Sequence, residues 1–142
     1  MNTQVNTAKK FSVGLKRISP SQVIAETHWQ RITLSTKWDD PTLWFTAPET
    51  VLTALGACIM TNIAKGAMEM GLKIEDSNME ITALKRNDPL GFDDLEYTVN
   101  IKSSEPMEKL QILFSRATNN GTVTNALLEW LKPKSNLSIS IS

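Results

Sequence analysis

The chain has 142 residues, of which 15 are basic and 15 acidic, so its formal net charge is zero. This balance gives no basic surface for nucleic acid or an anionic membrane, and we expect neither as a partner. The single cysteine excludes a disulfide within the chain. Because the chain also has only one histidine, there are too few ligands for a metal cluster, and we expect no metal or other cofactor. No charged-then-apolar leader opens the sequence, which indicates a soluble, cytoplasmic protein.

The first half of the chain opens with a tail and a meander. Residues 1–9 carry little to bury, and we expect a flexible tail in front of a single domain over residues 10–142. Alternation from Phe11 onward and turn-forming residues at 19–21 predict antiparallel strands near residues 11–16, 23–29 and 31–36. His28 is expected to be a solvated strand residue, and we assign it no catalytic role.

A loop over residues 37–48 leads from these strands into a helix. Its Asp39-Asp40-Pro41 sequence predicts a turn. Four aromatic residues in or near it either hold the loop down or line an apolar entrance to the cysteine: Trp29, Trp38, Trp44 and Phe45.

Thr46 to Gly71 is predicted to be one long, largely buried helix. Thr46 and Glu49 fit a capping box, and Gly71 follows the last periodic residue as a left-handed stop. One apolar stripe recurs at helical spacing through Leu52, Leu55, Ile59, Ile63, Gly66 and Met70. Small residues on this helix predict close packing against a second helix, and Cys58 lies on the flank of the stripe, with Asn62 on the same face.

The second half predicts a hairpin, two helices and a last strand. Runs at 79–86 and 95–102 flank a turn-forming segment at 87–94, and the second run alternates apolar and polar residues strictly. A helix opens near Pro106 and stops at residues 119–121, and a shorter helix ends at Pro133. Val123, Leu127, Trp130 and Leu131 share a face of that shorter helix, and residues 136–142 alternate as a strand.

The element order is therefore β-β-β-α-β-β-α-α-β. Runs of strands and runs of helices, without regular β-α-β alternation, are typical of an α+β fold, and we expect an antiparallel sheet with a long central helix.

Residues 48–75, PETVLTALGACIMTNIAKGAMEMGLKIE, resemble the cysteine helix and following strand entry of the OsmC/Ohr superfamily of thiol-dependent hydroperoxide-detoxifying proteins. The resemblance implies an OsmC-like fold and an intertwined homodimer whose two long helices pack centrally. It also implies a site with two cysteines, an arginine and a glutamate, in which the first cysteine attacks the peroxide and the second resolves the sulfenic acid.

The resemblance transfers to this chain only in part. Cys58 matches the attacking cysteine, whereas Gly121 stands where the resolving cysteine belongs. Glu49, nine residues before Cys58, matches the glutamate of general superfamily members, and the hydroperoxide-resistance branch has its glutamate one position earlier. For the arginine we prefer Arg17, with Arg31 as the alternative.

The chemistry of Cys58 requires help from outside its own helix. A thiol reacts as the thiolate, so it needs a nearby cation or hydrogen-bond donors, and Cys58 is too far into its helix for the helix dipole to supply them. We expect an arginine from another element to do so. The plainer alternatives are that Cys58 is a packed small hydrophobe and that Glu49 is only the partner of Thr46 in the cap.

These residues leave three functions open. The first is single-cysteine reduction of organic hydroperoxides in oxidative-stress defence, with Cys58 as nucleophile, Glu49 and Arg17 as catalytic partners, and an external thiol as reductant. The second is a non-catalytic module that binds an apolar small molecule at the dimer interface. The third is a redox sensor in which oxidised Cys58 is capped by a small thiol.

Overall fold

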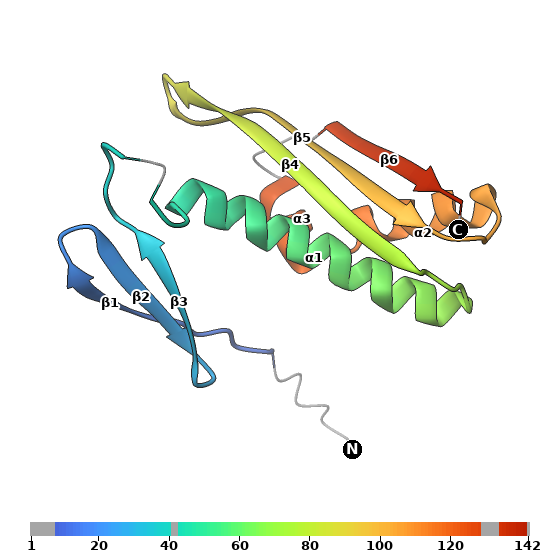
Figure 1. Ribbon diagram of the computed structural model, residues 1–142, viewed down its shortest axis with the longest axis horizontal. Helices are drawn as coiled ribbons and strands as arrows, with labels where there is room; N and C mark the ends of the chain where they lie inside the picture. The colour runs from blue at the N-terminus through green and yellow to red at the C-terminus, as the bar shows by residue number, and fades with distance from the viewer. Residues whose placement is uncertain (1–7, 41–42, 129–133, 142) are drawn as a thin grey trace, which may run out of the picture. The chain divides into compact units, whose positions relative to one another are not determined.

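The computed structural model describes residues 8–40, 43–128 and 134–141. The chain divides into two compact units, Met1–Thr50 and Val51–Ser142, and each is described by itself. The order of elements is β-β-β-α-β-β-α-α-β, as predicted (Figure 1). Most of the expected tail, residues 1–7, lies outside the described residues, and the single domain over residues 10–142 stays a prediction.

The first unit holds a three-stranded antiparallel meander of β1 (Gly14–Ser19), β2 (Gln22–Thr27) and β3 (Gln30–Ser35). Two details of the sequence prediction are wrong. The first strand begins at Gly14 and not at Phe11, and β2 ends before His28. His28 and Trp29 form the two-residue turn between β2 and β3, with φ angles of 48° and 65°. His28 is therefore a turn residue, in the left-handed conformation that a two-residue hairpin turn needs, and its side chain is exposed.

The aromatic residues around the loop are not buried. Trp29 and Trp38 are 94% and 92% exposed, and Trp44 and Phe45 are also exposed. The first alternative, that they hold the loop down by burial, is therefore wrong, and the second, an apolar entrance to the cysteine, stays a prediction. Backbone hydrogen bonds order the loop instead, from Ser35 N–H to the Phe45 carbonyl at 2.7 Å and from Asp40 N–H to the Lys37 carbonyl at 3.2 Å. The second bond confirms the turn at Asp39-Asp40, while Pro41 lies outside the described residues.

The long helix α1 (Ala47–Met70) begins and ends where the sequence predicts. Its cap is reciprocal: the Thr46 N–H donates to Glu49 Oε1 at 3.0 Å, and the Glu49 N–H donates to Thr46 Oγ1 at 3.5 Å. Gly71 follows with a φ of 67°, the left-handed conformation that glycine adopts without a steric cost.

The second unit contains a long hairpin of β4 (Asp76–Asn87) and β5 (Leu90–Lys102), with β6 (Lys134–Ser140) on the other side of β5. The predicted turn over residues 87–94 is wrong, since only Asp88 and Pro89 connect the strands. The Arg86 side chain donates to the Pro89 carbonyl at 2.9 Å and to Asp93 Oδ1 at 3.2 Å at this polar tip. The pairing register shifts between Thr82 and Leu84, before the tip.

The sheet of the second unit is mixed. β4 pairs with β5 antiparallel, but β6 pairs with β5 parallel, so the expected antiparallel sheet holds for every strand pair except this one. The reason is topological, since α2 (Met107–Asn119) and α3 (Thr122–Leu128) form the crossover connection that parallel neighbours need. Trp130, Leu131 and Pro133, predicted to complete the last helix, lie outside the described residues.

The core of the second unit lies between α1, α2 and the sheet. In Figure 1, α1 runs along the hairpin. The buried residues come from α1, β5 and α2: Leu55, Ile59, Ile63, Leu95, Tyr97, Val99, Ile101, Leu110 and Leu113. A Cβ added at Gly66 would lie 2.8 Å from Leu113 Cδ1. Gly66 thus makes room for the Leu113 side chain of α2 against α1.

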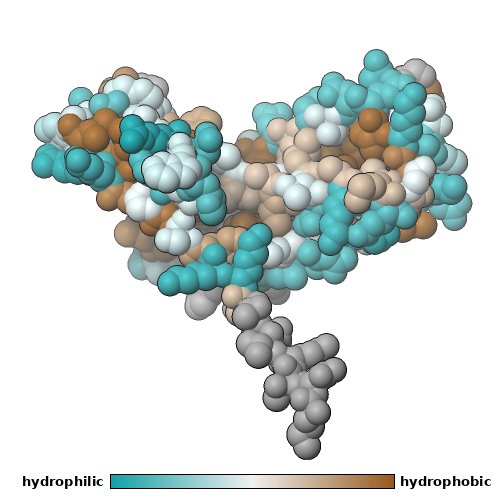
Figure 2. All heavy atoms as spheres, turned by 90° about the horizontal axis from the view of Figure 1, so that it is seen from below, coloured by the Kyte–Doolittle hydropathy of each residue, from teal (hydrophilic) through white to brown (hydrophobic). Residues whose placement is uncertain are grey.

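By length and composition alone, α1 is apolar enough to cross a membrane. Its stripe of Leu55, Ile59 and Ile63 is at most 2% exposed, however, so α1 is a core helix of the second unit. On the face drawn in Figure 2, hydrophobic residues reach the surface among hydrophilic ones. Exposed large hydrophobic residues of the first unit include Phe11, Val13, Leu15 and Ile32.

Candidate functional site

Cys58 lies in the second unit, about three turns into α1, and its side chain is partly buried. Two polar side chains lie beside its sulfur. Thr124 Oγ1, on α3, is 3.7 Å from Sγ, and Asn62 Nδ2, one turn further along α1, is 3.8 Å away. Both distances suit a hydrogen bond to sulfur, which is longer than one to oxygen. The thiol therefore has a polar environment and is not a packed small hydrophobe alone.

The first turn of α3 stabilises the thiolate. Burial raises the pKa of Cys58, but hydrogen bonds from the Thr124 backbone and hydroxyl and from the backbone N–H groups of Val123 and Thr122 outweigh it, so the pKa is below its ordinary value. N–H groups in the first turn of a helix have no partner within that helix, which makes them available to an anion.

This arrangement adds donors that the sequence did not predict. We expected an arginine to supply the donors for Cys58, and backbone N–H groups and the Thr124 hydroxyl of α3 supply donors as well. Reasoning from the sequence treated the start of α3 only as the place of an absent cysteine. The signal was nevertheless present, since matching Gly121 to a resolving cysteine already places the start of this helix next to Cys58.

Gly121 is the residue against which the thiol packs. A Cβ added there would collide with Cys58 Sγ and would lie 2.9 Å from both Asn62 Nδ2 and Thr124 Oγ1. The φ angle of Gly121 is outside the left-handed region, so its backbone conformation does not require glycine. Glycine is needed here for space, because the sulfur occupies the place of a side chain.

Glu49 lies in the first turn of α1 and belongs to the cap. Hydrogen bonds from the Thr46 backbone N–H and hydroxyl, at 3.0 and 2.9 Å, lower the pKa of its carboxyl group. The structure thus confirms the capping partner that the sequence predicted. A catalytic role of Glu49 toward Cys58 stays a prediction.

The two candidate arginines lie in the first unit. Arg17 is an exposed residue of β1, and Arg31 of β3 forms an ion pair with Glu26, from Nε to Oε2 at 2.7 Å. This pair is exposed, so it does not decide between Arg31 and the preferred Arg17. The predicted contribution of either arginine to the chemistry of Cys58 stays a prediction.

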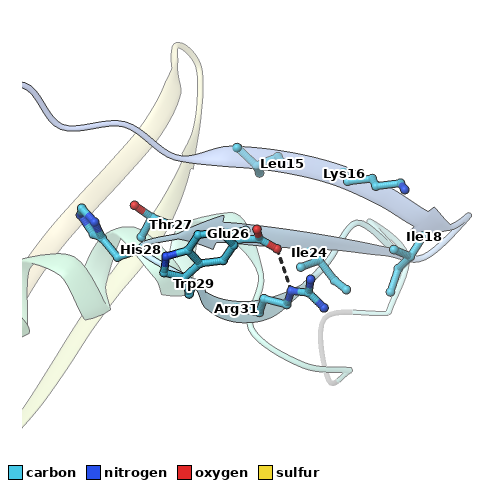
Figure 3. A pocket seen from close by; sticks show the side chains of 10 residues that line it. Leu15, Lys16, Ile18, Ile24, Glu26, Thr27, His28, Trp29 and Arg31 are labelled. Atoms are coloured by element: carbon cyan, nitrogen blue, oxygen red, sulfur yellow. Dashed lines mark hydrogen bonds and ion pairs between the residues drawn. The ribbon is translucent and has the colours of Figure 1, made fainter.

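A hollow of about 670 Å³ lies on one face of the first unit's sheet (Figure 3). Its walls combine apolar side chains with the Glu26–Arg31 pair, and the drawn apolar residues include Leu15, Ile18, Ile24 and Trp29. Its one candidate site residue is Arg31, already bound to Glu26. We assign no chemistry to this hollow.

Within residues 8–40, 43–128 and 134–141, no group of three or more histidine, cysteine, aspartate or glutamate side chains is placed to hold a metal ion. The candidate chemistry described above comes from the Cys58 thiol and its hydrogen-bond donors.

Comparison with known proteins finds a matching family model. The family model described as OsmC-like protein matches residues 40–133, about two thirds of the chain. That range contains Cys58, Asn62, Gly121 and Thr124. No curated protein sequence matches the chain.

Solved structures share the fold at low sequence identity. An OsmC-like protein from Mycoplasma pneumoniae aligns with a TM-score of 0.82 and 17% identity over 95% of this chain and 99% of that one. The organic hydroperoxide resistance protein OhrB of Bacillus subtilis aligns with a TM-score of 0.65 and 15% identity, over 92% and 98%. An organic hydroperoxide resistance protein OsmC from Legionella pneumophila gives 0.65 and 16%, over 94% and 99%.

Proposed function

The chain belongs to the OsmC-like protein family, and on that premise we propose that it reduces organic hydroperoxides in the cytoplasm with Cys58 as its single reactive thiol. The observation that carries the proposal is the contact between Cys58 and the first turn of α3, which lowers the pKa of the thiol. A lowered pKa increases the thiolate fraction near neutral pH, and the thiolate is the form that attacks a peroxide.

The first step is a two-electron oxidation of sulfur. The Cys58 thiolate attacks the distal oxygen of the hydroperoxide, the O–O bond breaks, and the alkoxide takes a proton and leaves as the alcohol. Cys58 becomes a sulfenic acid. The α3 donors that stabilise the thiolate remain available to the oxygen on sulfur.

The second step needs a thiol from outside the chain, because the sequence has one cysteine. An external thiol attacks the sulfenic sulfur, which gives a mixed disulfide and water. A second external thiol then releases Cys58 as the thiol and leaves as a disulfide with the first.

Peroxide consumption tests this proposal. We expect the wild-type protein with excess glutathione to consume cumene hydroperoxide over many turnovers, and Cys58→Ser to consume it no faster than glutathione alone. Trapping with dimedone separates the alternatives. Sulfenic acid that forms but is not turned over would favour a redox sensor, and Cys58 that stays reduced would favour the module that binds an apolar ligand.

We also propose that the chain is a homodimer, as the family resemblance implies. Supporting this, α1 exposes small or apolar side chains on the side away from its core, including Ala54, Ala57, Ala64 and Met68. Sedimentation at micromolar concentration should give a dimer, and Ala57→Trp should dissociate or unfold it. A monomeric wild-type protein would reject the proposal.

A further inference from the structure

A small polar pocket lies next to Cys58 in the second unit. It has a volume of about 170 Å³ and is lined by Asn62, Lys65, Gly66, Glu69, Arg116 and Asn120. This volume is well below the roughly 300–1,000 Å³ of a complete small-molecule site, so it suits one end of a ligand.

The pocket is connected to the thiol at two points. Asn62 lines it and also places Nδ2 3.8 Å from Cys58 Sγ. Asn120 lines it and directly precedes Gly121, the residue that packs against the same sulfur. A molecule seated in the pocket therefore has its other end near Cys58.

The charges of the pocket favour an anion. Glu69 is 2.8 Å from Arg116 and 3.9 Å from Lys65, so one carboxylate is shared between two cations. One positive charge remains, together with the side-chain amides of Asn62 and Asn120. A carboxylate from a ligand would complete this set, since arginine and lysine bind carboxylates directly.

The spacing indicates the size of the ligand. Along α1, the pocket extends from Asn62 to Glu69, which is roughly 6 to 16 Å from Cys58 at 1.5 Å per residue. An extended peptide covers about 3.3–3.6 Å per residue, so the anionic group and the sulfur of the ligand would be about two to five residues apart.

We propose that this pocket binds the carboxylate of the external reductant, and that the reductant is a small peptidic thiol with an anionic end. The inference rests on the proposed function, in which an outside thiol must attack oxidised Cys58. The pocket raises the rate of that attack by holding the anionic end while the thiolate faces the Cys58 sulfur.

The test uses thiol exchange, which needs no peroxide. Reaction with 2,2′-dithiodipyridine converts the single thiol into a Cys58 pyridyl disulfide. An added thiolate then attacks the Cys58 sulfur, a new disulfide forms, and 2-thiopyridone leaves and is measured by absorbance. Glutathione, which carries two carboxylates, is compared with its diethyl ester, which carries none, and the readout is the ratio of the two rate constants.

Three variants make the ratio informative. Lys65→Gln removes a cation of the pocket, and Glu69→Gln removes the anion that competes with the ligand. Lys109→Gln is the matched control, because Lys109 is an exposed lysine of α2 outside the pocket.

We expect the ratio to fall about two- to five-fold in Lys65→Gln, the range for an exposed charge pair. It should rise in Glu69→Gln, remain at the wild-type value in Lys109→Gln, and lose these differences in high salt. Equal ratios in all four proteins would overturn the inference. Charge-dependent exchange in a protein that consumes no peroxide would reject the proposed function alone.

Discussion

Replacing Gly121 by alanine removes the space that the Cys58 sulfur occupies. The added Cβ would collide with Sγ and come within 2.9 Å of Asn62 Nδ2 and Thr124 Oγ1. The sulfur must then move away from the first turn of α3. One methyl group therefore changes both the packing and the hydrogen bonds of the thiolate.

The magnitude follows from two opposing effects. Overpacking of a well-packed site costs about 1–3 kcal/mol. Alanine recovers about 0.4–1 kcal/mol by restricting the unfolded chain, because the φ angle at position 121 does not require glycine. The net loss of stability is about 1.3 kcal/mol at the midpoints of these two ranges. Loss of one donor to the thiolate, worth about 1 kcal/mol, would also slow alkylation at neutral pH roughly five-fold.

Urea denaturation and monobromobimane alkylation at pH 7 measure the two effects, at equal protein concentration. Gly14→Ala is the matched control, because a Cβ at Gly14 meets no atom within 4 Å. The control should alkylate at the wild-type rate. If Gly121→Ala is as stable as wild type and alkylates equally fast, the sulfur does not pack against α3 as described.

Three further predictions concern the same unit. In Gly121→Cys, the new side chain adjoins the Cys58 sulfur, so the two thiols should form a disulfide within the chain. After one equivalent of cumene hydroperoxide, both thiols per chain should be lost without intermolecular crosslinks. Two retained thiols would contradict this. The pKa of Cys58 is lowered in the folded state. The free energy of unfolding of wild type minus that of Cys58→Ser, measured in urea, should therefore rise with pH from the folded pKa to about 8.5 and fall as pH drops. A difference that does not change with pH would be inconsistent with a stabilised thiolate. Burial raises the pKa of Tyr97, the only tyrosine in the sequence, so its absorbance should titrate above pH 10 in the folded protein. The stability that this tyrosine contributes should be lost as pH rises beyond its pKa in the unfolded chain. Titration at the pKa of free tyrosine would refute its burial.

The sequence predicted those elements whose ends are encoded locally. Thr46, Glu49 and Gly71 define the limits of α1 by side-chain hydrogen bonds and by a left-handed backbone, so the helix could be located to within a residue. The alternating buried residues of β5 were predictable for the same reason, since a period of two needs no tertiary information.

Two features of the second unit were missed. The hairpin is longer than predicted, since residues of the expected turn pair as strand, and β6 is parallel because two helices carry the chain back to the same end of the sheet. The sequence identified Cys58 as the candidate nucleophile, and the match of Gly121 to a resolving cysteine already placed the start of α3 beside it. The donors there are the Thr124 hydroxyl and backbone N–H groups, and backbone groups carry no residue signature, so the fold was needed to assign them.

The central claim is that the first turn of α3 holds Cys58 as a thiolate. The most direct measurement is the pH dependence of Cys58 alkylation in the folded protein, compared with the same thiol in urea-unfolded chain. Because the chain has one cysteine, both profiles report the same group. The account predicts that the folded profile reaches half its maximum at a lower pH than the unfolded one. A folded profile at the same or a higher pH would contradict it.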